Sequence, residues 1–230
     1  MRSRRQRKEY DWSGSRILRH TVIPSKRGVI GSEDVLIPTD LREWITPPDS
    51  QVIKQALEKM NLPDTKKKGD FDRRAEKIWK QVAREIAYTP DEVAQRKIDF
   101  WQFPPETLAL GKGDCEDCAY LVASLLLSSG ISPFCVRVVF GTVRCKGRPP
   151  TGHAWPIYKN EAGVWVILDT ACDVLPKTPY LADDLVRKGS DPRYEPDICL
   201  NQYHVWTVGR GRRIRKVESY LRSRGWLPRT

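Results

Sequence analysis

The feature that most constrains the fold is one helical segment in the middle of the chain, acidic where it begins and apolar along its length. Apolar side chains recur there at helical spacing, and Gly130 follows as a stop signal, the apolar positions being Cys118, Leu121, Val122, Leu125 and Leu126. The pattern predicts a helix over residues 115–129. Cys115 then lies in its first turn, where unpaired backbone N–H groups and the positive end of the helix dipole stabilise a thiolate.

Three carboxylates, those of Asp114, Glu116 and Asp117, surround this cysteine. They oppose its ionisation, because negative charges beside a thiol raise its pKa. A neighbouring imidazolium has to outweigh them if Cys115 is to become a thiolate near neutral pH. The sequence therefore has to supply a histidine close to the start of this helix.

Two strand-like runs follow the helix, at residues 153–158 and 164–170, and turn-forming residues separate them. If the hairpin is symmetric about Glu161, residue n faces residue 322 − n, so that His153 lies directly opposite Asp169. Opposed Cβ atoms in such a pair are about 4.5–5.5 Å apart, which lets a carboxylate accept a hydrogen bond from an imidazole and fix its tautomer. Cys, His and Asp therefore occur in the order of a papain-like thiol triad.

The rest of the pattern predicts an α+β fold in which helices pack on one antiparallel sheet. A helix is expected between Asp49-Ser50 and Pro63, and a second, amphipathic helix over residues 71–87. Strands are expected near residues 134–143, 153–158, 164–170 and 202–208, and a basic helix near residues 213–224. Pro156 inside a strand indicates a sheet edge or a bulge.

Four motifs in combination are specific: Trp101 to Leu108 (WQFPPETL), Gly111 to Asp117 (GKGDCED), His153-Ala154-Trp155 and the strand-terminal Asp169. With them, residues 71–170 resemble the core of the transglutaminase-like superfamily, and most closely its bacterial cysteine proteinases. The resemblance implies a papain/transglutaminase-like core in which Cys115 is the nucleophile, His153 the general base and Asp169 the orienting acid.

The same resemblance implies two further assignments. Gln102 is the expected oxyanion donor, by analogy with papain-like enzymes in which a Gln upstream of the Cys has that role. In some bacterial members the acidic residues that flank the cysteine bind calcium, which makes Asp114, Glu116 and Asp117 candidate ligands. A solvated acidic helix start, stabilised by the helix dipole, accounts for the same three residues. Apart from calcium no cofactor is expected, since Cys115-x-x-Cys118 lacks the second C-x-x-C of a zinc site.

Positive charge is concentrated at the two ends of the chain. Residues 1–27 and 207–230 each carry a net charge of +7 in a chain whose total is +11, so residues 28–206 carry −3. We therefore expect a transglutaminase-like catalytic domain over residues 28–206 between a basic N-terminal and a basic C-terminal extension. These ends could bind nucleic acid, an acidic partner or a larger assembly, and they could equally be solvated tails.

The chain has no apolar run of the roughly 18–20 residues that a membrane span needs. No apolar stretch follows the basic N-terminus as it would in a signal peptide, so we expect a cytoplasmic protein. The six cysteines are then expected to be reduced thiols.

These patterns predict a cysteine hydrolase, a protease or amidase, that attacks a protein or peptide substrate and passes through an acyl-thioester. If a lysine amine receives the acyl group in place of water, the same triad makes a protein cross-linking transglutaminase, and the sequence does not separate the two. A third hypothesis is a non-catalytic structural or nucleic-acid-associated protein that uses its basic ends as clamps. An intact set of Cys, His and Asp argues against this third hypothesis.

Overall fold

The computed structural model describes residues 16–17, 22–28, 34–94, 100–171 and 175–208. Its main sheet has seven strands in the order β1-β11-β10-β6-β7-β8-β9, and every neighbouring pair is antiparallel. The strands are β1 (Arg16–Ile17), β6 (Val136–Arg144), β7 (Thr151–Lys159), β8 (Trp165–Ile167), β9 (Tyr180–Leu181), β10 (Arg193–Leu200) and β11 (Val205–Thr207). Two smaller ladders pair β2 (Val22–Gly28) with β3 (Asp34–Asp40), and β4 (Ala87–Tyr88) with β5 (Lys112–Gly113).

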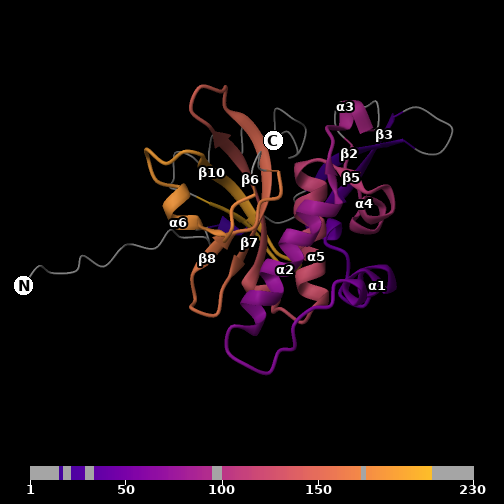
Figure 1. Cartoon of the computed structure of the whole chain (residues 1–230). Helices are drawn as coiled ribbons and strands as arrows, with labels where there is room; N and C mark the ends of the chain where they lie inside the picture. The colour runs from indigo at the N-terminus through magenta and orange to yellow at the C-terminus, as the bar shows by residue number, and fades with distance from the viewer. Residues whose placement is uncertain (1–15, 18–21, 29–33, 95–99, 172–174, 209–230) are drawn as a thin grey trace, which may run out of the picture.

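The helices from α1 to α5 gather on one side of the main sheet (Figure 1). The helical segments are η1 (Leu41–Trp44), α1 (Gln51–Lys59), α2 (Asp70–Glu85), α3 (Asp91–Ala94), α4 (Pro104–Leu110), α5 (Cys115–Ser128), η2 (Pro133–Cys135) and α6 (Ala182–Leu185). α5 contacts β6 and β7 of the sheet, and it also contacts α1, α2 and α4. This is the predicted α+β arrangement of N-terminal helices packed on an antiparallel sheet.

Helix α5 forms where the apolar spacing predicts it. Every side chain from Glu116 to Leu127 is buried, because the sheet covers one side of the helix and the other helices cover the rest. Two aspartates fix its first residue: the side chain of Asp114 accepts from the backbone N–H of Asp117, and the side chain of Asp117 accepts from that of Asp114. The helix therefore begins at Cys115.

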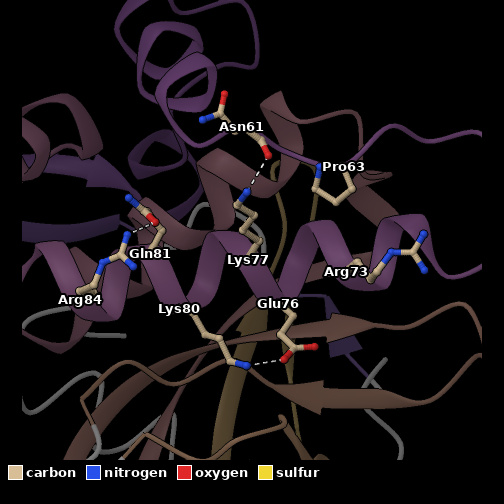
Figure 2. A pocket seen from close by; sticks show the side chains of 8 residues that line it. All are labelled: Asn61, Pro63, Arg73, Glu76, Lys77, Lys80, Gln81 and Arg84. Carbon is tan, nitrogen blue, oxygen red and sulfur yellow. Dashed lines mark hydrogen bonds and ion pairs between the residues drawn. The ribbon is translucent and has the colours of Figure 1, made fainter.

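Helix α2 confirms the predicted amphipathic segment, with Ala75, Ile78, Trp79 and Val82 facing the core. Its outer face carries four cations, called here the basic stripe, which are Arg73, Lys77, Lys80 and Arg84. With Asn61 and Pro63 they line an open cavity of about 540 Å³ (Figure 2). Lys80 pairs with Glu76, and Lys77 donates to the carbonyl of Asn61 at 2.6 Å, so the fold itself engages part of this charge.

The β7–β8 hairpin forms, but the predicted register is wrong by two residues. Ile157 pairs with Ile167, so residue n faces residue 324 − n. The reason lies in the turn, which Asn160 closes onto Val164 with its backbone N–H (2.9 Å) and its side chain (2.8 Å), centring the hairpin on Ala162. His153 is thus diagonal to Asp169 rather than opposite it. Because strand side chains alternate with a period of two, an even shift keeps both on one face of the sheet.

Pro156 does not behave as predicted. Pro156 lies in an interior strand that pairs with β6 without a break, so the expected edge or bulge at this position is wrong. Its carbonyl accepts from the N–H of Leu168 (2.9 Å) where the β8 ladder ends, so the missing N–H of the proline falls at the margin of that ladder. The bulge is in β10, between Pro196 and Ile198.

The predicted basic helix over residues 213–224 lies outside the described residues, as do most of the two basic ends. The division of the chain at residues 28 and 206 therefore stays a prediction. None of the helices in the described ranges has both the length and the apolar character needed to cross a membrane.

Candidate active site

The imidazole of His153, in β7, is held by Asp169, which follows β8. Nε2 lies 2.8 Å from Oδ2 of the carboxylate, and both side chains are largely buried. The same Oδ2 accepts from the hydroxyl of Tyr194 at 2.7 Å, while Oδ1 accepts from the N–H of Ala171 at 2.9 Å. Trp79 anchors the backbone, because its indole N–H donates to the carbonyl of Asp169 at 2.7 Å. With Nε2 engaged, Nδ1 is the nitrogen left to exchange a proton.

The charge state of Asp169 is set by competing effects. Burial alone would raise the pKa of this carboxyl, but the charge and hydrogen bond of His153 lower it, and so do the bonds from Ala171 and Tyr194. The net result is a pKa below the ordinary value of an aspartate. Asp169 is therefore ionised across the neutral range and favours the tautomer that carries its proton on Nε2.

Cys115 lies in the first turn of α5, against β7. Burial, and then the charges of Glu116 and Asp114, raise the pKa of its thiol well above the ordinary value, and a hydrogen bond from the N–H of Ala154 lowers it. The thiol donates to Oε2 of Glu116 at 3.1 Å rather than to the ring of His153. The fold thus brings Cys115 to the residue that follows His153, with the thiol protonated and turned toward Glu116.

Gln102, the predicted oxyanion donor, is buried just before α4. Its Nε2 donates to Oδ2 of Asp117 at 2.6 Å and its backbone N–H donates to Oδ1 at 2.7 Å. Burial and the charge of Asp114 raise the pKa of Asp117 to about 8, although the N–H of Gln102 lowers it. In this arrangement the amide of Gln102 is directed at Asp117, and the oxyanion role stays a prediction.

The predicted calcium ligands divide into two groups. Asp114 and Asp117 are joined by Asp91 of α3, and single carboxylate oxygens of the three lie within 4.8 Å of one another. Glu116 instead lies with Asp114 and the thiol of Cys115, because consecutive helical residues point about 100° apart.

The donors of the first group fit a hard cation. Three carboxylates supply oxygen ligands of the kind that calcium takes. Gln102, whose amide nitrogen bonds to Asp117, also has a buried carbonyl oxygen without a hydrogen-bond partner among the described residues. Asp91, Asp114 and Asp117 are therefore the residues of this chain that could hold such an ion.

A cavity of about 470 Å³ opens beside His153 and Asp169, which is within the size range of ligand-binding clefts. Aromatic side chains and a basic loop line it, among them Tyr88, Tyr180, Tyr194, Cys145, Arg148 and Pro149. The loop directly precedes β7, so it is covalently tied to the strand that carries His153. Such a cleft could admit an extended peptide to the imidazole.

Two residues of the candidate site, Tyr194 and Asp91, were not predicted from the sequence. Tyr194 lies in β10, where Pro192 and Pro196 conceal the strand pattern. Asp91 follows Pro90, which signals a turn but points to no ligand. Only the pairing of β10 with β6, and of β4 with β5, brings these segments to the site.

Comparison with known proteins bears on the family and the fold. Residues 58–170 match the transglutaminase-like superfamily. The structure of Legionella pneumophila LapG is 18% identical with a TM-score of 0.50, over 75% of this chain and 85% of that one. Calcium-bound LapG is also 18% identical, with a TM-score of 0.49 over 74% and 87% of the two chains. The UPF0252 protein PH1321 of Pyrococcus horikoshii is 39% identical over 84 residues, which are 36% of this chain and 23% of that protein.

The segment that carries Cys115, His153 and Asp169 is the part of this chain that is similar to the transglutaminase-like superfamily. Its fold is similar to that of LapG, and at 18% identity this likeness establishes the fold alone. The chain spans only about a quarter of the length of the Pyrococcus relative.

Proposed function

We propose that the protein is a cysteine hydrolase that cleaves an amide or peptide bond in a protein or peptide substrate. The observation that carries the proposal is the His153–Asp169 pair, with Nε2 and Oδ2 2.8 Å apart. The helix of Cys115 packs against β7, the strand that carries His153. The superfamily match over residues 58–170 supports the same chemistry.

In the proposed reaction the thiol of Cys115 gives its proton to Nδ1 of His153, and the sulfur attacks the carbonyl carbon. N–H groups at the start of α5, with Gln102 as the predicted further donor, stabilise the oxyanion. The C–N bond breaks and the amine leaves with the proton from Nδ1. A water molecule then gives a proton to Nδ1 and hydrolyses the thioester, which releases the acid and restores the thiol, while Asp169 keeps the other nitrogen protonated.

The position of the thiol favours a competing hypothesis, a protein that keeps the fold without the activity. Cys115 donates to Glu116, and its pKa is raised, which is the condition of an unreactive buried thiol. Catalysis requires the thiol to leave Glu116 and give its proton to Nδ1 of His153. The two hypotheses therefore differ in how fast Cys115 reacts.

Alkylation of the folded protein by iodoacetamide at pH 6–7, read residue by residue by mass spectrometry, tests the proposal. Cys115 should react faster than Cys135, and His153→Ala should remove this advantage. His204→Ala is the matched control, since this half-buried histidine lies in the turn before β11 and outside the cavity. If Cys115 reacts no faster than Cys135, the hydrolase proposal is wrong and the non-catalytic hypothesis is supported. Incorporation of a fluorescent primary amine into a protein that acts as the acyl donor would instead indicate cross-linking.

We also propose that Asp91, Asp114 and Asp117 bind calcium. Three carboxylates brought this close repel one another, and a divalent cation removes that repulsion, so binding should stabilise the folded state. Calcium at millimolar concentration should raise the Tm of the wild type in chelator-treated buffer. Asp91→Asn should abolish the increase, and Asp49→Asn, a change outside this group, should keep it. An equal increase in both variants would contradict the assignment.

A further inference from the structure

Tyr194 makes a contact that the mechanism above does not use. Its side chain is 2% exposed, and its hydroxyl donates to Oδ2 of Asp169 at 2.7 Å. This is the same oxygen that lies 2.8 Å from Nε2 of His153. One carboxylate oxygen thus accepts from two side chains, one on each of two different strands, β7 and β10.

Aromatic packing fixes the position of the phenol ring. It meets the ring of Trp155 edge to face, with centroids 4.9 Å apart and an interplanar angle of 70°. The imidazole of His153 stacks over the same indole with centroids 5.9 Å apart. Trp155, which is fully buried, therefore serves as a common platform for His153 and Tyr194.

The backbone of β6 sets the distance between β10 and the histidine strand. Gly141 pairs with His153 on one side and with Pro196 on the other, next to the bulge of β10. A Cβ built on Gly141 would come within 2.2 Å of the carbonyl oxygen of Glu195, the residue after Tyr194. Only glycine at this position lets β10 approach closely enough for the hydroxyl to reach Asp169.

We propose that Tyr194 is a positioning residue of the His–Asp pair: its hydroxyl fixes the rotamer of Asp169 so that Oδ2 faces Nε2 of His153 and Nδ1 stays free. The inference rests on the proposed function as far as catalysis is concerned, and on the contacts above as far as the imidazole is concerned. Loss of the hydroxyl removes one donor to Oδ2, and a carboxylate with fewer donors turns more freely about χ2, because a terminal torsion of this kind has broad minima. With the hydroxyl in place, the bonds from Tyr194, His153 and Ala171 together favour one orientation.

The variant Tyr194→Phe removes the hydroxyl and keeps the ring against Trp155. Tyr158→Phe is a matched control, because Tyr158 is 3% exposed and its hydroxyl donates to a carboxylate, Asp72 of α2, at 2.9 Å near the other end of β7. Both variants remove one bond from a buried tyrosine to an aspartate, so both should lose some stability in denaturant unfolding. Only the first should change the site.

Two measurements separate positioning from a structural role. The ¹⁵N resonances of the His153 ring should report the Nε2–H tautomer in the wild type and in Tyr158→Phe, and a mixture of tautomers in Tyr194→Phe. The rate of iodoacetamide reaction at Cys115 should fall about 10-fold to 100-fold in Tyr194→Phe, which is the loss of affinity or activity seen when a hydrogen-bond partner that orients a metal ligand is removed. The rate should stay unchanged in Tyr158→Phe.

A Tyr194→Phe protein with the wild-type tautomer and the wild-type rate would overturn the inference. If Tyr194→Phe does not fold, Gly141→Ala displaces the same hydroxyl and should give the same mixture of tautomers. A wild-type Cys115 that reacts no faster than Cys135 would overturn the proposed function but not this inference, which the ¹⁵N measurement would then decide alone.

Discussion

At the scale of single residues, Asp169 is where the contacts of the site converge. His153 and Tyr194 share its Oδ2, Ala171 bonds to its Oδ1, and Trp79 holds its backbone carbonyl. Each of these partners comes from a different place in the sequence. The position of this carboxylate therefore depends on the assembly of β7, β8 and β10, and it sets the geometry of the imidazole.

Asp169→Asn should keep the fold and lower the turnover by orders of magnitude, about 10⁴-fold where the same change was made in a Ser-His-Asp triad. Both carboxylate oxygens accept hydrogen bonds, so either orientation of the amide sets an NH₂ group against a donor and disturbs the tautomer of His153. The rate of Cys115 alkylation measures the effect until a substrate is found. Wild-type reactivity in Asp169→Asn would show that another group orients the imidazole.

The lowered pKa of Asp169 predicts a pH dependence of stability. Its pKa is lower in the folded protein than in the unfolded chain, where it is about 3.9. The ionised carboxylate therefore contributes stability above that pH, and the contribution is lost as the pH falls through the folded-state pKa. Urea unfolding of the wild type and of Asp169→Asn should give a difference in unfolding free energy that is larger at pH 7 than at pH 3. A difference independent of pH would contradict the assigned pKa.

At the scale of elements, strong local signals were predictable and long-range pairings were not. α5 and α2 follow from apolar spacing alone, since each helix buries one continuous set of side chains. The hairpin was predictable as a pair of strands, but its register depends on how Asn160 closes the turn. The error of two residues did not separate His153 from Asp169, because an even shift preserves the face.

The same reasoning explains which parts of the site were found. Cys115 and His153 stand next to recognisable helix and strand patterns, whereas Tyr194 reaches the site only because β10 joins the sheet beside β6. That pairing crosses about 50 residues of sequence and leaves no local signal. Asp91 was missed for the same reason, because the β4–β5 pairing brings it to Asp114 and Asp117.

Gly141→Ala should destabilise the fold by about 1–3 kcal/mol, the usual cost of overpacking, because its Cβ would lie 2.2 Å from a backbone oxygen of β10 that cannot rotate away. Gly152→Ala, in the neighbouring strand, is the control: its Cβ would have no neighbour within 4 Å, so the change should be neutral or slightly stabilising. Urea unfolding of both variants measures the difference. Equal stabilities would mean that β6 and β10 are not as close as described.

At the scale of the whole molecule, net charge distinguishes residues 28–206 from the two ends of the chain. Residues 28–206 carry −3 and each basic end carries +7. Within the described part, the four cations of the basic stripe of α2, Arg73, Lys77, Lys80 and Arg84, line one open cavity (Figure 2). Association with a polyanion therefore has two candidate surfaces, and the sequence alone pointed only to the ends.

Deleting residues 1–12 should weaken any association with a polyanion and leave the alkylation rate of Cys115 unchanged. This segment carries five basic and two acidic residues, and each contact with a duplex phosphate contributes about 0.9 to the slope of log K against log salt concentration. If the ends carry the binding, the slope measured with duplex DNA should become shallower by up to about 4 or 5.

Lys77→Ala combined with Lys80→Ala is the matched comparison, because it removes charge from the basic stripe and leaves both ends intact. A slope that changes only in this second variant would assign the association to α2, and no binding of the full chain at about 50 mM salt would leave both surfaces merely solvated. Loss of thiol reactivity on truncation would show instead that the N-terminal segment packs on the catalytic domain and that the boundary expected at residue 28 is wrong.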